Sequence, residues 1–171
     1  MKFLTARLSI DNWDVELSDP SRRGVLERAL ENILTAKITR YLPASMQVAA
    51  GQDSISEWVD ERVNEAQVLC VHSRGAHRLV GLIILAEGPE PSALRTIHLG
   101  YFLGEADWGK GYATEIVTAL LANLGKGQAV RLLAGVDNHN LASVRVLEKS
   151  GFEKSHEQLT DSRSFFEVVI A

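Results

Sequence analysis

The sequence predicts an α+β fold in which a mixed, mainly antiparallel sheet is flanked by about four helices. Three observations support this prediction. Strand-like and helix-like segments alternate as strand, two helices, three strands, helix, strand, helix and two strands. Short polar turns between consecutive strands favour antiparallel pairs, whereas a helix between two strands favours a parallel pair. The 171 residues suffice for a core, and we expect a single domain over residues 1–171.

The N-terminal segment predicts one strand followed by a helix. Residues 3–10 alternate weakly between apolar and polar side chains and are expected to form the first strand. Asp19 followed by Pro20 is typical of a helix N-cap with proline at the first helical position. Apolar residues then recur at helical spacing as far as Ile38, which predicts a helix that ends before Pro43.

A second helix and a hairpin are expected next. Residues 42–53 show no periodicity and predict a loop, after which Ser54 and Glu57 have the spacing of a capping box. Beyond this helix, residues 67–72 and 78–86 are apolar strands separated by a short polar turn, which is typical of a hairpin.

The C-terminal half alternates strands with helices before a final strand pair. A strand over residues 93–103 precedes a helix that ends near Leu124, with Gly125 and Gly127 as stop signals. A strand over 130–136 and a helix from Asn140 to Ser150 follow. The last two expected strands cover residues 152–158 and 165–170.

Composition restricts the classes of partner and the location. The net charge is −4 with no basic block, which argues against a nucleic acid or an anionic membrane as the main partner. The single cysteine, Cys70, lies in an apolar run and is expected in the core, with no internal disulfide. The apolar run near residues 79–86 is too short to span a bilayer, and no signal peptide is visible. We therefore expect a cytoplasmic protein.

The histidines do not suggest a metal site. They are scattered through the chain without the short spacing of a ligand pair, so we expect solvated or core histidines and no metal. The five are His72, His77, His98, His139 and His156.

The segment from Leu99 to Leu124 carries the first functional signal. An apolar strand leads into a glycine-rich corner at Trp108–Ala113, and a helix of apolar periodicity follows. The N–H groups at a helix N-terminus lack partners and carry partial positive charge, and glycines allow an anion to approach them. The pattern therefore suggests a phosphate site. A tight strand-to-helix connection without a ligand is the alternative, and the spacing matches neither a P-loop nor a dinucleotide fingerprint.

The segment from Asn140 to Phe152 carries the second signal. Asn140 is expected to cap a helix whose first turn holds the Ser143 hydroxyl and, further on, Arg145. A purely local capping role explains Asn140 and Ser143 equally well, because both residue types are preferred at helix starts.

Taken together, these two segments resemble the GCN5-related N-acetyltransferase (GNAT) superfamily, and within it the ribosomal-protein N-terminal acetyltransferase (RimJ/RimL-like) branch. The resemblance is carried by Leu99–Leu103, by Trp108–Glu115 and by the pattern from Asn140 to Phe152. Thr5-Ala6-Arg7-Leu8 resembles the same branch more weakly. The close match covers residues 97–152, and the order of elements agrees over the whole chain.

The resemblance implies that acetyl-CoA is the cofactor. It implies a V-shaped opening between the fourth and fifth strands, residues 93–103 and 130–136, in which pantetheine pairs with the fourth strand as an added strand would. The corner would wrap the pyrophosphate with backbone N–H groups. The cofactor-binding residues it implies are Tyr101, Phe102, Leu103, Trp108, Gly109, Lys110, Gly111, Tyr112, Ala113, Thr114, Asn140, Ser143 and Arg145.

The implied reaction is attack by a neutral amine on the acetyl thioester. This needs a base for the amine proton and a donor for the oxyanion, and a backbone N–H near Phe102 or Leu103 could be that donor. Several members of the branch carry Glu two residues before the glycine that matches Gly100. This chain has His98 there, which is either the catalytic base or an ordinary strand residue. Glu105 is a weaker alternative base.

The general acid and the acceptor are less determined. Many superfamily members have Tyr where this chain has Leu147, so the acid role passes to Ser143, to water or to no group. The acceptor pocket is expected from residues 40–56 and the last two strands, which hold few of the carboxylates that a polyamine would need.

The leading functional prediction is an N-acetyltransferase that acts on a primary amine. A protein N-terminal amine and a small-molecule amine remain equally open as acceptors. Because the expected Tyr and Glu are missing, a non-catalytic acyl-CoA sensor is the alternative. A partner-binding domain that has lost the cofactor is disfavoured by the intact corner. The chain is expected to act as a monomer or homodimer.

Overall fold

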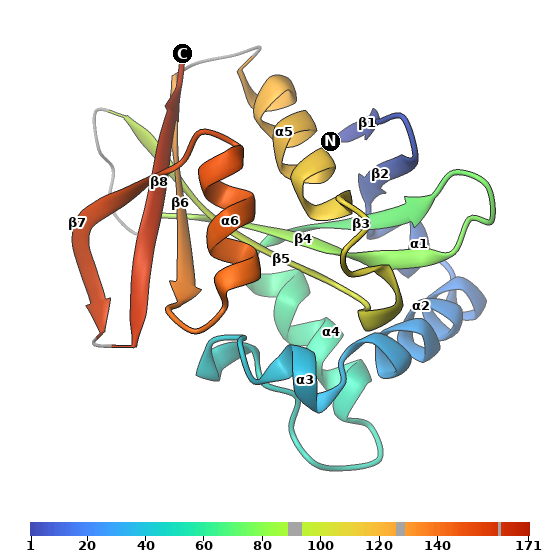
Figure 1. Ribbon diagram of the computed structural model, residues 1–171. Coiled ribbons are helices and arrows are strands. Elements are labelled where there is room, and N and C mark those ends of the chain that lie inside the picture. The colour runs from blue at the N-terminus through green and yellow to red at the C-terminus, as the bar shows by residue number, and fades with distance from the viewer. Residues whose placement is uncertain (89–93, 126–128, 161) are drawn as a thin grey trace. The chain divides into compact units, whose positions relative to one another are not determined.

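The computed structural model describes residues 1–88, 94–125, 129–160 and 162–171 (Figure 1). Eight strands are hydrogen-bonded in the order β1-β2-β3-β4-β5-β6-β8-β7, which confirms the predicted mixed α+β fold. Residue contacts divide the chain into two compact units, residues 1–83 with 101–110 and residues 84–100 with 111–171. β4 (Leu79–Glu87) and β5 (Arg95–Leu103) contribute residues to both units. Ala93 and Gly127, predicted as a strand start and a helix stop, lie outside the described residues.

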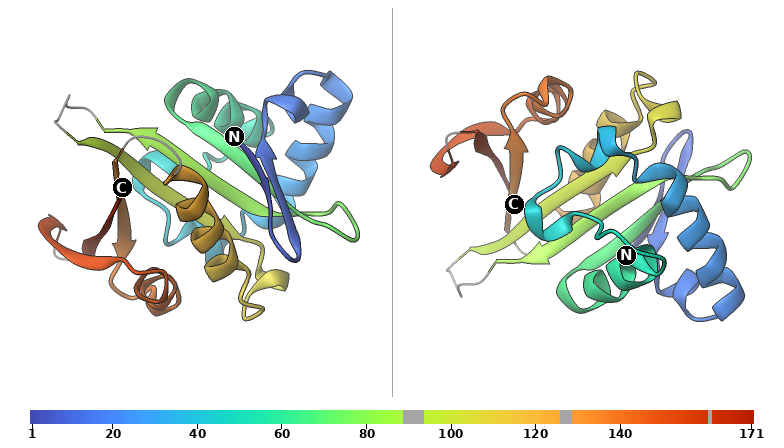
Figure 2. Two further views of the ribbon diagram at one scale, coloured as in Figure 1. Left: turned by 90° about the horizontal axis from the view of Figure 1, so that it is seen from above. Right: turned by 90° about the horizontal axis from the view of Figure 1, so that it is seen from below.

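The first unit begins with a strand hairpin where a single strand was predicted. β1 (Lys2–Leu4) and β2 (Leu8–Asn12) pair antiparallel, as the blue arrows in Figure 2 show. The prediction of one strand over residues 3–10 was therefore wrong. The cause is local, because the Thr5 hydroxyl accepts the Leu8 N–H at 2.9 Å and the Thr5 N–H donates to the Leu8 carbonyl at 2.9 Å. These bonds close a tight turn.

The predicted first helix is also divided. α2 (Pro20–Ile33) starts as expected, since the Asp19 carboxylate accepts the N–H groups of Ser21 and Arg22. It ends at Leu34, where ψ is 57°, because Thr35 adopts an extended conformation and its hydroxyl donates to Glu105 at 2.5 Å. A contact with a residue distant in the sequence thus ends the helix earlier than its apolar pattern indicates.

Four short helices were not predicted as separate elements, and one cap was placed wrongly. α1 (Asp14–Leu17) precedes α2, while α3 (Ala36–Thr39) and the 3-10 helix η1 (Ala44–Met46) follow it. A second 3-10 helix, η2 (Glu105–Asp107), lies between β5 and the glycine-rich corner. α4 (Ser54–Glu65) begins one residue earlier than the proposed capping box requires. Asp53 is the N-cap, without a side-chain bond, and Ser54 is already helical.

The core of the first unit lies between its strands and helices. β3 (Gln67–Ser73) pairs antiparallel with β2 and is apolar at its centre, where Cys70 is 1% exposed. Burial raises the pKa of the Cys70 thiol above its usual range. The prediction of a core cysteine is therefore confirmed.

The second unit contains the parallel strand pair. β5 pairs with β6 (Val130–Asp137) from Arg95 opposite Val130 to His98 opposite Leu133. β5 continues to Leu103 and β6 to Asp137, so both strands run on beyond the end of their pairing at His98 opposite Leu133. β6 pairs antiparallel with β8 (Arg163–Ile170) along its length, and β7 (Glu153–Thr160) follows at the edge with a shifted register.

Two long helices complete this unit. α5 (Tyr112–Leu124) buries Ile116, Val117 and Leu120, and α6 (Leu141–Lys149) buries Leu147. The two helices contact each other. None of the described helices is both long and apolar enough to span a bilayer.

Gly81 allows the end of β5 to approach β4 closely. A Cβ atom at Gly81 would lie 2.1 Å from the Phe102 carbonyl oxygen and 2.8 Å from Leu103 Cδ2. The alternation of β5 also breaks here, because both Phe102 and Leu103 are buried. Only glycine therefore fits at this position without moving the backbone that leads into the corner.

We expect Gly81→Ala to lower the free energy of unfolding by about 1–3 kcal/mol, because the added methyl group overlaps main-chain atoms. Urea denaturation measures the change. Gly75→Ala is the matched control, since a Cβ at Gly75 meets nothing within 4 Å. Equal stability of the two variants would show that β5 does not press on Gly81.

Candidate functional site

The glycine corner, residues Trp108–Thr114, has a backbone conformation that depends on its two glycines. Gly109 and Gly111 have φ values of +71° and +78°, which residues with side chains rarely adopt. Gly111 is the N-cap of α5 and offers no side chain to cap the helix. A Cβ at Gly109 would meet nothing within 4 Å, so the space beside the corner is open. The start of α5 thus has no side-chain cap, and helix N-termini of this kind are where anions bind.

The end of β5, the strand before the corner, is buried. Phe102 and Leu103 are 6% and 7% exposed, and the Phe102 ring packs edge-on against Trp58 with centroids 6.3 Å apart. The Trp108 indole N–H donates to the Leu103 carbonyl at 2.9 Å, although 47% of the Trp108 surface is exposed. The side chains of these two predicted cofactor contacts on β5 are therefore buried.

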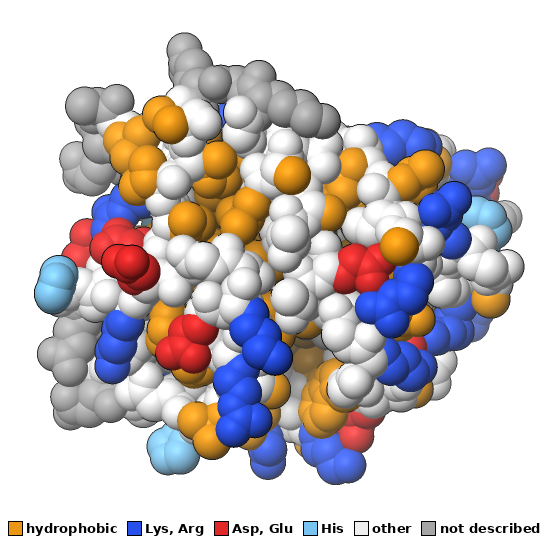
Figure 3. Space-filling view, turned by 45° about the horizontal axis from the view of Figure 1, so that its top comes forward, with side chains coloured by type: hydrophobic (Ala, Val, Ile, Leu, Met, Phe, Trp, Pro, Cys, Tyr) orange, Lys and Arg blue, Asp and Glu red, His pale blue; other side chains and the backbone are white. Residues whose placement is uncertain are grey.

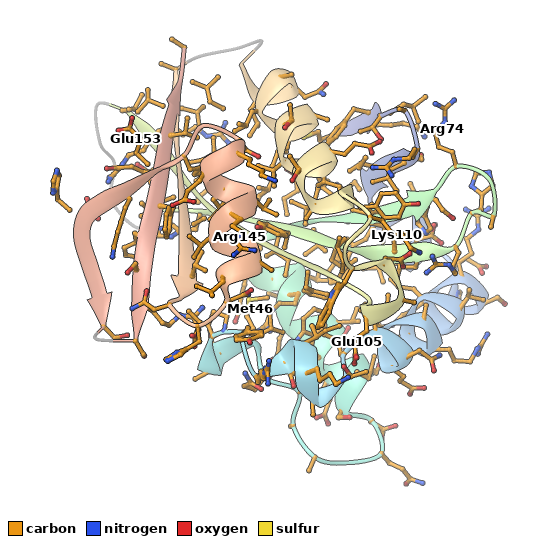
Figure 4. The ribbon with its side chains drawn as sticks, viewed as in Figure 1. Met46, Arg74, Glu105, Lys110, Arg145 and Glu153 are labelled. Carbon is orange, nitrogen blue, oxygen red and sulfur yellow. The ribbon has the colours of Figure 1, made fainter. Side chains whose placement is uncertain are left out.

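A buried carboxylate just before the corner binds two basic side chains. Asp107 is 1% exposed, and its oxygens accept two bonds from the Arg78 guanidinium at 2.7 Å each. The Lys110 ammonium donates to the same carboxylate at 3.1 Å (Figure 4). The bonds from Arg78 in particular lower the pKa of Asp107. The sequence analysis did not identify this cluster, because its only local sign is that Asp107 lies three residues before Lys110.

The second predicted segment forms the start of α6. The Asn140 side chain accepts the Ser143 N–H at 3.2 Å, which confirms the predicted cap. Arg145 lies on the same helix (Figure 4). Within the second unit, α6 contacts α5, so these residues and the helical end of the corner belong to neighbouring helices.

His98 lies where β5 leaves β6. It is half-buried, whereas its neighbours Ile97 and Leu99 are buried, so its ring faces away from the side of the sheet that they occupy. The His98 and Phe165 rings meet edge-to-face with centroids 6.1 Å apart. The parallel pairing of β5 with β6 ends at His98.

Glu105, the weaker alternative base, accepts hydrogen bonds from two other side chains. Its carboxylate accepts the Thr35 hydroxyl at 2.5 Å and the Lys37 ammonium at 2.9 Å. These two bonds, the Thr35 bond first, lower the pKa of Glu105. A carboxylate stabilised in this way is a poorer proton acceptor.

The last two strands hold a shallow hollow. It has a volume of about 380 Å³ and lies where the register of β7 and β8 shifts. Its lining is polar, and it includes the nearly buried hydroxyl side chains of Ser155 and Ser164. The remaining lining residues are Lys154, His156 and Glu157.

Residues 40–56, the other stretch predicted to build the acceptor pocket, are tied down within the first unit. The Trp58 indole N–H donates to the Met46 carbonyl at 3.0 Å (Figure 4). The Gln47 amide donates to the carbonyls of Thr39 and Leu42 at 2.6 and 2.9 Å. The loop is thus ordered by side-chain bonds to main-chain carbonyls, which no periodicity in the sequence could show.

Comparison with known proteins identifies the same class as the two motifs. Residues 22–153 match the model of the acetyltransferase (GNAT) domain. A probable N-acetyltransferase, YjcK of Bacillus subtilis (strain 168), is 42% identical over 78 residues, which is 45% of this chain and 42% of that protein. The match thus spans less than half the length of this curated relative.

Solved structures show the same fold. A GNAT-family acetyltransferase from Bacillus anthracis superposes with a TM-score of 0.75 at 19% identity, covering 99% of this chain and 98% of that one. RimL, the ribosomal L7/L12 α-N-protein acetyltransferase, was solved in complex with coenzyme A. It superposes with a TM-score of 0.72 at 15% identity, covering 99% and 98% of the two chains.

We expect Asp107→Asn to lower the free energy of unfolding at pH 7 by about 1–3 kcal/mol, because charged hydrogen bonds are lost. The folded pKa of Asp107 is lowered, so its contribution is present above the unfolded value of about 3.9 and is lost as pH falls through the folded pKa. The variant should therefore lose less stability than the wild type on acidification. Urea denaturation from pH 7 to pH 3 measures this.

Asp53→Asn is the control for that series, because Asp53 is exposed and makes no side-chain cap bond. If Asp107→Asn and Asp53→Asn give the same stability at pH 7, the Asp107 carboxylate does not hold the corner.

Proposed function

Because the chain belongs to the GNAT acetyltransferase family, we propose that it transfers an acetyl group from acetyl-CoA to a primary amine. The observation that carries the proposal is the early end of the β5–β6 pairing at His98 opposite Leu133. Beyond that point β5 runs on for five residues, Leu99 to Leu103, toward the glycine corner. An extended chain with amide groups can pair with such a strand, and pantetheine is a chain of this kind.

The residues present suit the cofactor. The uncapped start of α5, with glycines at positive φ, fits a pyrophosphate. Asn140 caps α6, and we propose that Ser143 and Arg145 on this helix contact the rest of the cofactor. Bound acetyl-CoA supplies the thioester at which a neutral amine is acetylated, with release of the CoA thiol.

His98 is proposed as the base that accepts the amine proton. An imidazole can act as a general base, and the Phe165 ring contacts the His98 ring edge-to-face. Main-chain N–H groups near Phe102 or Leu103 are proposed to stabilise the oxyanion. Ser143 is proposed as the donor to the leaving thiolate.

The charges on β6, β7 and β8 favour an acceptor with one amine. The Arg131 guanidinium bonds to Glu157 at 2.8 Å and also to Glu167. Both carboxylates therefore already have a cationic partner, and the Arg131 bond lowers the pKa of Glu167. A polyamine needs carboxylates free to pair with it, so we propose a protein N-terminal amine or a small monoamine as the acceptor.

An acyl-CoA sensor without turnover is the second candidate. It is favoured by Leu147, which is fully buried at the position where many superfamily members have Tyr. The two candidates share cofactor binding and differ in chemistry alone.

Thiol release from acetyl-CoA, screened against short peptides with free N-termini, monoamines and polyamines, tests the proposal. We expect thiol release with peptides or monoamines and little with polyamines. Tight CoA binding by calorimetry without release for any amine would instead support the sensor.

We expect His98→Ala to lower kcat by about a hundredfold, the usual scale for a lost general base, while CoA affinity stays nearly constant. The acidic limb of the pH–rate profile should flatten, and the deficit should narrow at high pH, where the amine deprotonates unaided. Steady-state kinetics from pH 6 to pH 10 measure both effects.

The control is His77→Asn, which replaces a histidine in the turn after β3. His77 has φ +47°, a conformation that Asn tolerates, so the fold should be kept. Wild-type kcat with an unchanged acidic limb in His98→Ala would exclude His98 as the base.

A further inference from the structure

The turn Thr5–Leu8 between β1 and β2 has no role in the chemistry proposed so far, yet it reaches the glycine corner. The Arg7 guanidinium donates to the Lys110 carbonyl at 2.9 Å across 103 residues of sequence. Lys110 is therefore held twice, at its carbonyl by Arg7 and at its ammonium by the buried Asp107.

The turn that carries Arg7 is itself braced. Beyond the Thr5–Leu8 bonds, the Arg74 guanidinium donates to the carbonyls of Thr5 and Ala6 at 3.0 and 3.3 Å. The Arg74 N–H also donates to the Arg7 carbonyl at 3.0 Å. Figure 4 places Arg74 on the turn after β3 and Lys110 on the loop before α5. Arg74 thus fixes the backbone from which Arg7 extends.

Peptide geometry passes this restraint to the start of α5. The Lys110 carbonyl and the Gly111 N–H belong to one planar peptide unit, and in a trans unit they point in opposite directions. Among the described residues no peptide bond is cis. A bond that holds the Lys110 carbonyl toward Arg7 therefore directs the Gly111 N–H away from Arg7. That N–H comes at the N-cap of α5, where the proposed pyrophosphate site begins.

We propose that Arg7 is a positioning residue for the cofactor pyrophosphate, acting through the Lys110 carbonyl, and that Arg74 holds Arg7 in place. This inference rests on the proposed use of acetyl-CoA. It accounts for the Thr5-Ala6-Arg7-Leu8 motif, whose threonine closes the turn and whose arginine reaches the corner.

A direct attraction between positive charge and phosphate is the competing explanation. Figure 3 shows Lys and Arg side chains gathered at the right of that view, the side on which Figure 1 draws β1, β2 and the turn after β3. Charges that attract independently give additive losses of affinity, whereas residues acting in series give non-additive losses. The two explanations therefore differ in a measurable way.

The test is calorimetric binding of CoA and of 3′-dephospho-CoA to the full chain and its variants. We expect Arg7→Met to weaken both ligands about tenfold, the scale of one lost hydrogen bond from a charged donor. Arg74→Met should weaken both ligands less, and Arg7→Met/Arg74→Met no more than Arg7→Met alone. KM for acetyl-CoA should rise in step while kcat stays near the wild-type value. Arg22→Met, which removes one exposed charge from α2, should change nothing.

Three outcomes would overturn the inference. They are wild-type affinity in Arg7→Met, a loss that disappears with 3′-dephospho-CoA, and additive losses in the double variant. If Arg7→Met does not fold, Arg74→Met alone decides, since it must weaken both ligands equally. Failure of the wild-type chain to bind CoA would instead refute the proposed function, so the two failures are distinguishable.

Discussion

A strand that outruns its neighbour must satisfy its main-chain groups in another way, and β5 is subject to this constraint. Its parallel pairing with β6 ends at His98, but the strand continues to Leu103. At its end, the Leu103 carbonyl takes the Trp108 indole N–H, and Gly81 makes room for the Phe102 carbonyl. Beyond the point at which this strand stops, a short 3-10 helix, the glycine corner and α5 follow in that order.

Local signals in the sequence were sufficient wherever the structure is determined locally. The Asp19–Pro20 start of α2 and the Asn140 cap of α6 depend on side chains within three residues of the N–H groups they bind. The two glycines of the corner likewise have positive φ where the pattern required a turn before a helix. Each of these features is encoded within a few consecutive residues.

Features that depend on distant partners were missed or misplaced. The end of α2 near Leu34 is tied to a bond between Thr35 and Glu105, which lie 70 residues apart in sequence. The buried Asp107 carboxylate is paired with Arg78, which lies just before β4. For the same reason the sequence offered Glu105 as a base, because nothing near it in the chain shows that Thr35 and Lys37 bind its carboxylate.

Because Cys70 is buried, we expect the folded chain to react very slowly with thiol reagents. It is the single cysteine, it is 1% exposed, and burial raises its pKa, so the reactive thiolate is scarce. A chromogenic disulfide added during turnover would therefore record CoA thiol with almost no background from the protein. Without substrate, the rate at which the same reagent labels Cys70 would measure how often the β2–β3 region opens, because each opening exposes one thiol.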